Sequence, residues 1–332
     1  MSAATDIENI LLIRLKSIGD IIFTLPAVHV VRENFPQARI TFLVSREHAP
    51  LVEGFREVDG VITLDRALYR RGNPVAIVRE TLTLLRRLRR DKFSRALDFQ
   101  GYGETALLTW CTRAPRRWGL VYQPARGWAY THRVKRDPRL HPVDWNLSLV
   151  QQCGLRAGPI RNEFILPDPA LAEARRLFAA HGLDPARPAL FLQPFTSALK
   201  KDWPLENFLA LARRAQVQGL QVLFGGGPAE HAALEPARQA GFPVFSGAPL
   251  LVAGGLMRLS TLIVGGDTGL LHLAVALGRR VLMLIRHARP GATIPYQHAD
   301  WIVAPPADSS LQQIELEPVW QRVRDALGEL RR

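Results

Sequence analysis

The 332-residue sequence has no apolar run near the roughly 18–20 residues needed to span a bilayer. Its N-terminal residues place acidic side chains before the first apolar run and carry no basic segment, unlike a secretory signal peptide. We therefore expect a cytoplasmic protein. The only two cysteines, Cys111 and Cys153, fit neither a metal-ligand spacing nor a disulfide framework, so we expect two small buried side chains.

Several site motifs are also missing. No D-x-D pair and no zinc-type cluster occurs, so no metal site and no cofactor is expected. The absence of a G-x-x-x-x-G-K-[ST] loop argues against an ATPase. The first apolar run is not followed by G-x-G-x-x-G, which argues against a dehydrogenase.

Positive charge is abundant and unevenly placed. The formal net charge is +13. Residues 1–166 hold 26 Lys and Arg against 16 Asp and Glu, whereas residues 167–332 hold 17 against 14. We expect the first half to meet an anionic partner, which could be nucleic acid, a membrane surface, or a phosphorylated or carboxylated acceptor. Solubility alone is the other explanation.

Strand-like apolar runs alternate with helical segments throughout the chain. The run 10–15 precedes a helix expected over 21–34, and the alternation continues through the second half. This pattern predicts two α/β domains, each with a doubly wound parallel sheet, over residues 1–160 and 161–310. Residues 114–142, rich in Pro, Arg and aromatics, are expected to form a long loop, and the Pro-rich residues 157–169 the interdomain linker.

Two loops could carry chemistry at the carboxyl ends of strands, where such sheets bind ligands. In KSIGD (16–20), Asp20 could deprotonate a sugar hydroxyl, or it could merely cap the following helix. In GGDTG (265–269), backbone N–H groups at a helix start suit a diphosphate. Asp267 and His272 could add polar contacts there, although His272 could equally be a satisfied buried histidine.

Two further loops follow strands of the second half. TSALKKDWP (196–204) offers hydroxyl and lysine groups that suit a leaving diphosphate, and otherwise is a solvated loop over a packed Trp. GGGPAE (225–230) places Glu230 to bind a ribose, or forms only a tight turn before a helix.

At these four places together, and over most of its length, the chain resembles glycosyltransferase family 9, the lipopolysaccharide heptosyltransferases. The segments that carry the resemblance are ILLIRLKSIGDIIFTLPAV, DFQGYGETALLTWCTRAPRRWGL, LQPFTSALKKDWPLENFLALA, GGGPAEHAAL and GGDTGLLHLAVALGRRVLMLI. The order of S-I-G-D, K-x-W-P and D-T-G-x-x-H-L-A is more specific than any one motif.

The resemblance implies a GT-B fold, in which two Rossmann-like domains face an interdomain cleft. A C-terminal helix in 311–332 would cross back to the first domain. It implies an enzyme that moves heptose from ADP-heptose to the Kdo-lipid A inner core, and peripheral contact with the cytoplasmic face of the inner membrane. No nucleic acid is expected as a partner. We expect the transfer to invert the anomeric centre without a metal.

Site residues follow from the matched motifs. Asp20 would be the general base, and Lys201 would bind the diphosphate and stabilise it as it leaves, with Lys200 as its alternative. The other implied donor-site residues are Thr196, Ser197, Glu230, Asp267, Thr268, Gly269 and His272. The expected acceptor-side residues are Ser17, Gly19, Gln100, Arg116 and Arg117. The two arginines are expected to hold anionic groups of the acceptor, because Arg forms bidentate contacts with carboxylates and phosphates.

Two segments depart from the family pattern. The loop QPFTSALKK (193–201) has an unusual Phe195 and two lysines, which is why Lys200 is an alternative to Lys201. Residues 285–296 read IRHARPGATIPY where the family has F-G-x-T-x-P. The same mechanism with another nucleotide sugar, or with a later core or O-antigen acceptor, is therefore the alternative. A non-catalytic nucleotide- or nucleic-acid-binding protein is a third hypothesis, which the basic first half permits.

Overall fold

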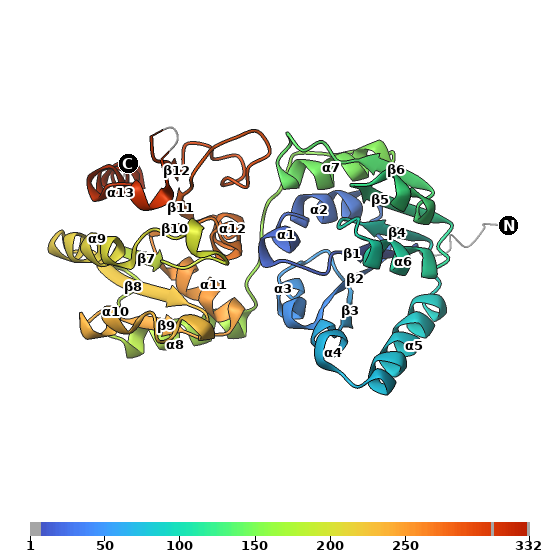
Figure 1. The fold of residues 1–332 in the computed structure, drawn as a ribbon, viewed down its shortest axis with the longest axis horizontal. Helices are drawn as coiled ribbons and strands as arrows, with labels where there is room; N and C mark the ends of the chain where they lie inside the picture. Colours follow the sequence, from blue (N-terminus) through green and yellow to red (C-terminus); the bar gives the residue numbers. More distant parts are fainter. Residues whose placement is uncertain (1–7, 307–308, 331–332) are drawn as a thin grey trace. The chain divides into compact units, whose positions relative to one another are not determined.

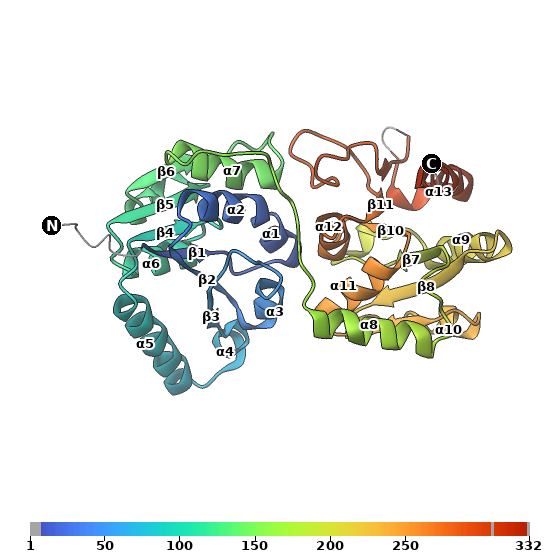
Figure 2. The same ribbon diagram turned by 180° about the vertical axis from the view of Figure 1, so that it is seen from behind.

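The computed structural model describes residues 8–306 and 309–330, and the chain divides into two compact units between Asn162 and Glu163 (Figures 1 and 2). Each unit contains a six-stranded, wholly parallel sheet covered by helices. The predicted doubly wound α/β class is therefore confirmed. The domain boundary expected from the sequence, between residues 160 and 161, lies two residues before the division in the structure.

In the first unit the strand order is β3 (Gly60–Leu64), β2 (Arg39–Ser45), β1 (Asn9–Ile13), β4 (Arg95–Asp98), β5 (Arg116–Val121) and β6 (His132–Lys135). The helices are α1 (Ile18–Ile22), α2 (Leu25–Asn34), α3 (Ala49–Val52), α4 (Arg66–Arg71), α5 (Pro74–Arg90), α6 (Gly103–Cys111) and α7 (Pro142–Gln152), with 3₁₀ turns η1 (Arg46–His48) and η2 (Pro124–Ala129).

In the second unit the order is β12 (Ile302–Val303), β11 (Arg280–Leu284), β10 (Leu262–Gly266), β7 (Ala189–Gln193), β8 (Gln221–Gly226) and β9 (Val244–Ser246). The helices are α8 (Asp168–Ala180), α9 (Leu205–Val217), α10 (Glu235–Gln239), α11 (Leu250–Leu259), α12 (Gly269–Ala276) and α13 (Leu316–Leu330), with η3 (Leu199–Lys201), η4 (Pro228–Glu230) and η5 (Leu311–Gln313).

Both sheets have the same topology. Numbered from the first strand of each unit, the order is 3-2-1-4-5-6, the Rossmann arrangement, in which the direction of winding reverses between strands 1 and 4. The central strands are buried on both faces, which explains why β1 and β7 read as continuous apolar runs. The crevice at each reversal is formed by the loops after β1 and β4, and after β7 and β10.

Two sequence expectations were wrong in detail. The helix expected over 21–34 is two helices, because Pro26 lacks an N–H and fits only the first turn of a new helix, α2. The loop expected over 114–142 contains β5, η2 and β6. Gly119 suggests a break in β5, but the ring of Tyr130 packs so closely over it that any side chain there would clash.

The C-terminal helix α13 is built into the second unit. Its buried side chains Val319, Trp320, Val323 and Ala326 belong to the core formed around β7, β8 and β10. The expected return of residues 311–332 to the first domain concerns how the two units are placed, and it stays a prediction.

Candidate functional site

Asp20 lies in the first turn of α1, in the loop that follows β1. Its Oδ2 accepts hydrogen bonds from the backbone N–H (3.2 Å) and the hydroxyl (3.1 Å) of Ser17. Nη2 of Arg14 lies 2.8 Å from the same oxygen. The N-cap is therefore Ser17, and Asp20 completes a capping box from within the first turn rather than capping a helix that begins at Ile21. Asp20 also forms an ion pair with Arg14.

Arg14 was not singled out from the sequence, although it is the residue that holds Asp20. Its side chain is only 7% exposed. Nε donates to the carbonyl oxygen of Lys16 (2.9 Å), and Nη1 donates to that of Phe99 (2.7 Å). One guanidinium thus ties the ends of β1 and β4 to the carboxylate. A charge inside the apolar run ILLIRLK was the available signal, because a buried charge requires partners.

The D-F-Q-G segment after β4 is structural in this arrangement. Asp98 is fully buried and accepts hydrogen bonds from the N–H groups of Gln100 (2.8 Å) and Gly101 (2.9 Å) and from the Tyr130 hydroxyl (2.7 Å). Burial raises the pKa of Asp98 despite these donors. Gln100, expected on the acceptor side, is also fully buried, and its Oε1 accepts from the N–H of Leu15 (2.9 Å). Gln100 therefore joins the loops after β1 and β4.

The other predicted acceptor residues do not gather at one place. Ser17 is exposed and Gly19 is buried, both in the Asp20 loop. Arg116 and Arg117 begin β5, at the amino edge of the sheet, where Arg117 donates to the carbonyls of Ala129 and Ala114. Because parallel strands end at the other edge, the structure separates these arginines from Asp20, and they do not form an acceptor clamp beside it.

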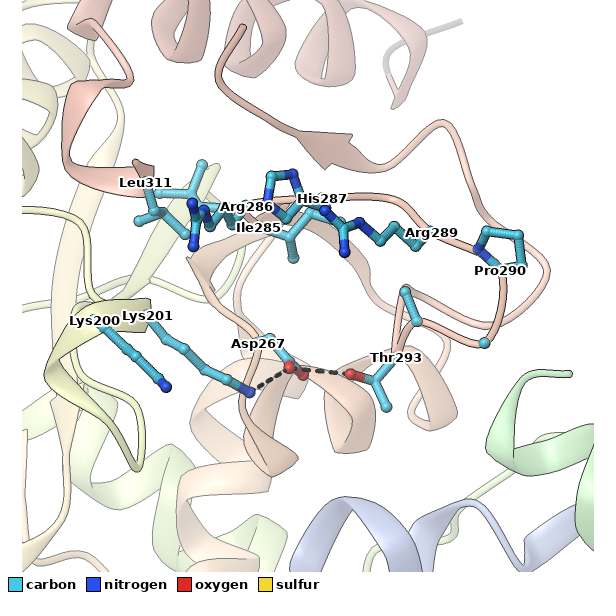
Figure 3. A pocket seen from close by; sticks show the side chains of 13 residues that line it. Lys200, Lys201, Asp267, Ile285, Arg286, His287, Arg289, Pro290, Thr293 and Leu311 are labelled. Atoms are coloured by element: carbon cyan, nitrogen blue, oxygen red, sulfur yellow. Dashed lines mark hydrogen bonds and ion pairs between the residues drawn. The ribbon is translucent and has the colours of Figure 1, made fainter. Parts of the chain in front are cut away.

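Asp267 is the centre of the second unit's site (Figure 3). Its Oδ2 lies 2.9 Å from Nζ of Lys201 and accepts a hydrogen bond from the Thr293 hydroxyl (3.0 Å). Its Oδ1 lies 3.2 Å from Nε2 of His272, which is 4% exposed. Burial alone would raise the pKa of Asp267, but the bonds to His272 and Lys201 outweigh it and lower the pKa to about 2. Four segments of the chain thus meet at an ionised carboxylate.

A pocket of about 470 Å³ opens beside this carboxylate. Lys200 and Lys201 line one side, and Arg286, His287 and Arg289 line the opposite side (Figure 3). Asp267 is the one acidic residue among the lining residues. The pocket is therefore strongly cationic and suits a ligand with several negative charges, such as a nucleoside diphosphate. The segment that departs from the family pattern, residues 285–296, supplies eight of the thirteen lining residues.

The GGDTG loop has two structural roles. A side chain at Gly265 would come within 2.6 Å of the Gln193 carbonyl, and one at Gly266 within 2.6 Å of Thr196. These glycines therefore allow close packing of β10 against the loop after β7. Thr268 then precedes α12, which begins at Gly269, and free N–H groups at such a helix start attract anions.

The remaining predicted donor residues are held by local bonds. Glu230 caps η4 by accepting a hydrogen bond from the Gly227 N–H. It therefore stabilises the tight turn, as the simpler of the two hypotheses for this loop expected. The Thr196 hydroxyl bonds within its own loop, to the Ala198 carbonyl (3.0 Å), while Ser197 is exposed. Lys201, rather than Lys200, is the lysine paired with Asp267.

Residues 8–306 and 309–330 contain no group of three or more His, Cys, Asp or Glu side chains placed to hold a metal ion. Within the same residues, no helix combines the length and apolar character that crossing a bilayer requires.

Two Rossmann-like domains, the second with a cationic pocket at its winding reversal, are the arrangement of proteins with the GT-B fold. The family glycosyltransferase family 9 (heptosyltransferase) matches residues 81–316, so the chain belongs to that family. The chain is 24% identical to the lipopolysaccharide core heptosyltransferase OpsX of Haemophilus influenzae, with 90% of this chain and 84% of OpsX covered. It is 27% identical to lipopolysaccharide heptosyltransferase 1 of Pseudomonas aeruginosa, with 87% of this chain and 81% of that protein covered.

Solved structures agree on the fold. The ADP-heptose LPS heptosyltransferase II of E. coli superimposes with a TM-score of 0.81 at 21% identity, covering 98% of this chain and all of that one. E. coli heptosyltransferase WaaC with ADP gives a TM-score of 0.79 at 20% identity, covering 96% of this chain and 99% of that one. The GT-B fold expected from the resemblance is thereby confirmed, and membership of glycosyltransferase family 9 confirms the expected glycosyltransferase activity.

Proposed function

We propose that this enzyme transfers heptose from ADP-heptose to an anionic inner-core acceptor of the Kdo-lipid A type, at the cytoplasmic face of the inner membrane. The observation that carries the proposal is the cationic pocket around Asp267 at the start of α12. Membership of a heptosyltransferase family and the names of the relatives support heptose and lipopolysaccharide.

The donor diphosphate would lie between Lys200, Lys201 and the N–H groups at Thr268 and Gly269. Two positive side chains and a helix start oppose the charge that grows on the leaving diphosphate, which is the task a metal ion would otherwise perform. We therefore propose that transfer needs no metal. Asp267 keeps Lys201 in place, and Glu230 would bind the ribose through the carboxylate oxygen that does not accept from Gly227.

The acceptor hydroxyl would lose its proton to Asp20. Oδ2 is already occupied by Ser17 and Arg14, whereas no bond to Oδ1 occurs within the described part of the chain. Oδ1 is therefore the proton acceptor. As the O–H bond breaks, the acceptor oxygen attacks the anomeric carbon, and the bond from that carbon to the phosphate oxygen breaks. ADP leaves with the electron pair from the opposite face, so a single displacement inverts the centre.

The first test is ADP release from ADP-heptose with Kdo-lipid A in EDTA, with Asp20→Ala alongside. We expect release that requires acceptor and persists in EDTA, and a fall of about 10²–10⁴-fold in turnover for the variant, since general base catalysis contributes that much. ADP binding should be unchanged in the variant. Turnover that barely changes would leave Asp20 as a helix cap only.

A donor sugar with a negative charge of its own is a second candidate. Lys201 is paired with Asp267, but no ion pair to Lys200, Arg286 or Arg289 occurs in residues 8–306 and 309–330. These three cations exceed the two charges of a diphosphate. Faster transfer from an ADP-linked uronic acid than from ADP-heptose would favour this candidate, and Arg286→Gln with Arg289→Gln should then remove the preference. Faster transfer from ADP-heptose would exclude it.

A further inference from the structure

The positive charge of the chain is concentrated in one segment. Residues 66–136 contain seventeen Arg and Lys but four Asp and Glu, an excess of +13 that equals the excess of the whole chain. The rest of the sequence is balanced. Most of these basic side chains are exposed, including Arg70, Arg79, Arg86 and Arg113. The charge therefore belongs to the surface of α4, α5 and the segments on either side of α6, which itself has no Arg or Lys.

The same segment holds most of the exposed large apolar side chains. Thirteen are found in the described residues, and eight of them lie within 66–136. The eight are Tyr69, Val75, Val78, Leu82, Tyr102, Leu107, Trp110 and Trp128. Scattered exposed apolar residues need no explanation, but a cluster inside a basic segment does.

Helix α5 is amphipathic over its whole length but buries only part of its apolar face. Leu84 and Leu88, in its second half, are its buried residues. In its first half Val75 (75% exposed), Val78 and Leu82 follow the spacing i, i+3, i+7 and form one stripe on the surface. Arg79 and Arg86 flank this stripe. A helix with an apolar stripe bordered by arginines suits the boundary between lipid headgroups and acyl chains.

Helix α6 adds a second apolar element beside α5 (Figures 1 and 2). Leu107 and Trp110 are exposed three residues apart on α6. The Trp110 ring lies 5.8 Å, edge to face, from the ring of Trp128, which belongs to η2 and is 56% exposed. Exposed Trp side chains are typical of membrane interfaces, where one end of the ring is apolar and the other hydrated.

We propose that this surface, which we call the α4–α6 face (Tyr69, Val75, Val78, Leu82, Leu107, Trp110 and Trp128 with the arginines around them), docks on an anionic lipid bilayer. The Trp pair and the α5 stripe enter the headgroup region, and the arginines contact lipid phosphates. The combination of apolar stripe, aromatic pair and net positive charge fits anionic lipid better than it fits a protein partner, whose interface would deplete charge at its centre.

The face also adjoins the acceptor side of the site. Tyr102 directly follows Gly101 in the loop after β4, and Arg126 donates to the Gly101 carbonyl (3.3 Å). Docking here would bring the carboxyl edge of the first sheet near headgroups. The docking proposal rests on the proposed function only for this last step, because vesicle binding itself needs no acceptor.

Binding is tested with the full chain and vesicles of phosphatidylcholine, with or without phosphatidylglycerol, in about 0.1 M salt, where surface charges still act over about 10 Å. We expect binding to the mixed vesicles only. Arg79→Gln and Arg86→Gln should each weaken it about fivefold, since one basic residue near such a surface contributes about that factor. Val78→Asp and Trp110→Ser should weaken it about tenfold or more, because they remove the inserted groups.

Matched controls lie on α9 of the second unit. Val217 is 83% exposed and Arg213 is exposed, so Val217→Asp and Arg213→Gln make the same changes elsewhere and should leave vesicle binding unchanged. Circular dichroism confirms that each variant is folded. The proposal is overturned if the wild-type chain ignores anionic vesicles, if the controls weaken binding as much, or if the variants change self-association instead.

Transfer assays separate docking from catalysis. With a lipid-free core oligosaccharide as acceptor, Val78→Asp and Trp110→Ser should retain wild-type turnover, and with vesicle-embedded acceptor they should lose it in parallel with vesicle binding. If no acceptor is used at all, the proposed function fails while vesicle binding is still decided by the first experiment. Equal loss with both acceptors would contradict a docking role.

Discussion

At the scale of single residues, the Asp20 carboxylate depends on Arg14. One guanidinium contacts Asp20, the Lys16 carbonyl and the Phe99 carbonyl, so it fixes both the charge and the position of the proposed base. Misplacing a reacting group by about 1 Å can cost about 10²-fold in rate. Arg14 is thus a positioning residue, one step away from the acceptor.

Arg14→Gln should lower kcat about 10–100-fold and leave the Kd for ADP unchanged, because all residues that line the proposed nucleotide pocket belong to the second unit. Arg14→Lys, which keeps the charge but cannot make all three contacts, should recover part of the loss. Steady-state kinetics and calorimetric ADP titration measure the two quantities. If the lysine variant is no better than the glutamine variant, or if ADP affinity falls as well, Arg14 is merely supporting the fold.

Sequence reasoning could find the loop residues of both proposed sites, but it could not find the buried contacts that hold them. Asp20, Lys201 and Asp267 stand in loops after apolar strands, and the motif resemblance implied their roles. Arg14, which no motif singled out, and Gln100, which was expected to contact the acceptor, are both buried. Each also bonds to backbone groups that strand pairing brings together, and no local sequence pattern encodes those contacts. Arg116 and Arg117 have side chains suited to binding an anion. Their place at the amino edge of the sheet, however, follows from the register of β5, which the sequence does not show.

At the scale of elements, Asp267 joins the end of β10 to η3, α12 and the loop that carries Thr293. Its pKa of about 2 lies below the usual 3.8. Since the folded state lowers this pKa, the carboxylate stabilises the fold by about 2 kcal/mol at pH values above about 4. That contribution decreases as the pH falls toward about 2.

Asp267→Asn should therefore lower the free energy of unfolding by about 2 kcal/mol near pH 6, and by about 1 kcal/mol less than that at pH 3. Urea titration followed by tryptophan fluorescence at the two pH values measures the change. Asp300→Asn, an exposed aspartate of the same unit, controls for the substitution. A difference between wild type and Asp267→Asn that is constant with pH would mean that the carboxylate contributes through packing rather than charge.

Element boundaries depended on features that the sequence shows only ambiguously. The Pro and Arg residues of 114–142 suggested a loop, yet β5 and β6 are the last two strands at one side of the sheet, where flanking polar residues are tolerated. Pro26 was available as a signal for the break between α1 and α2, since its ring permits only a helix start. The central strands β1 and β7 could be predicted because burial on both faces makes them continuously apolar.

At the scale of the whole molecule, the two units carry separate cores and separate parts of the proposed reaction. Leu190, Phe208 and Trp320 are among the side chains of the second unit's core, and the residues lining the proposed nucleotide pocket, from Lys200 to Leu311, come from the same unit. A unit with its own core is able to fold alone. Nucleotide binding should therefore not need the first unit, whereas transfer should need both.

The fragment 163–332 should fold and bind ADP with a Kd within about threefold of that of the full chain, a difference of less than about 1 kcal/mol, and it should transfer no sugar. Lys201→Ala in the fragment should abolish most of the binding, which shows that the proposed pocket is the one being measured. Circular dichroism and calorimetry on both fragments decide the matter. A fragment that is folded but does not bind ADP would mean that the first unit supplies nucleotide contacts, and the division of donor and acceptor between the units would have to be redrawn.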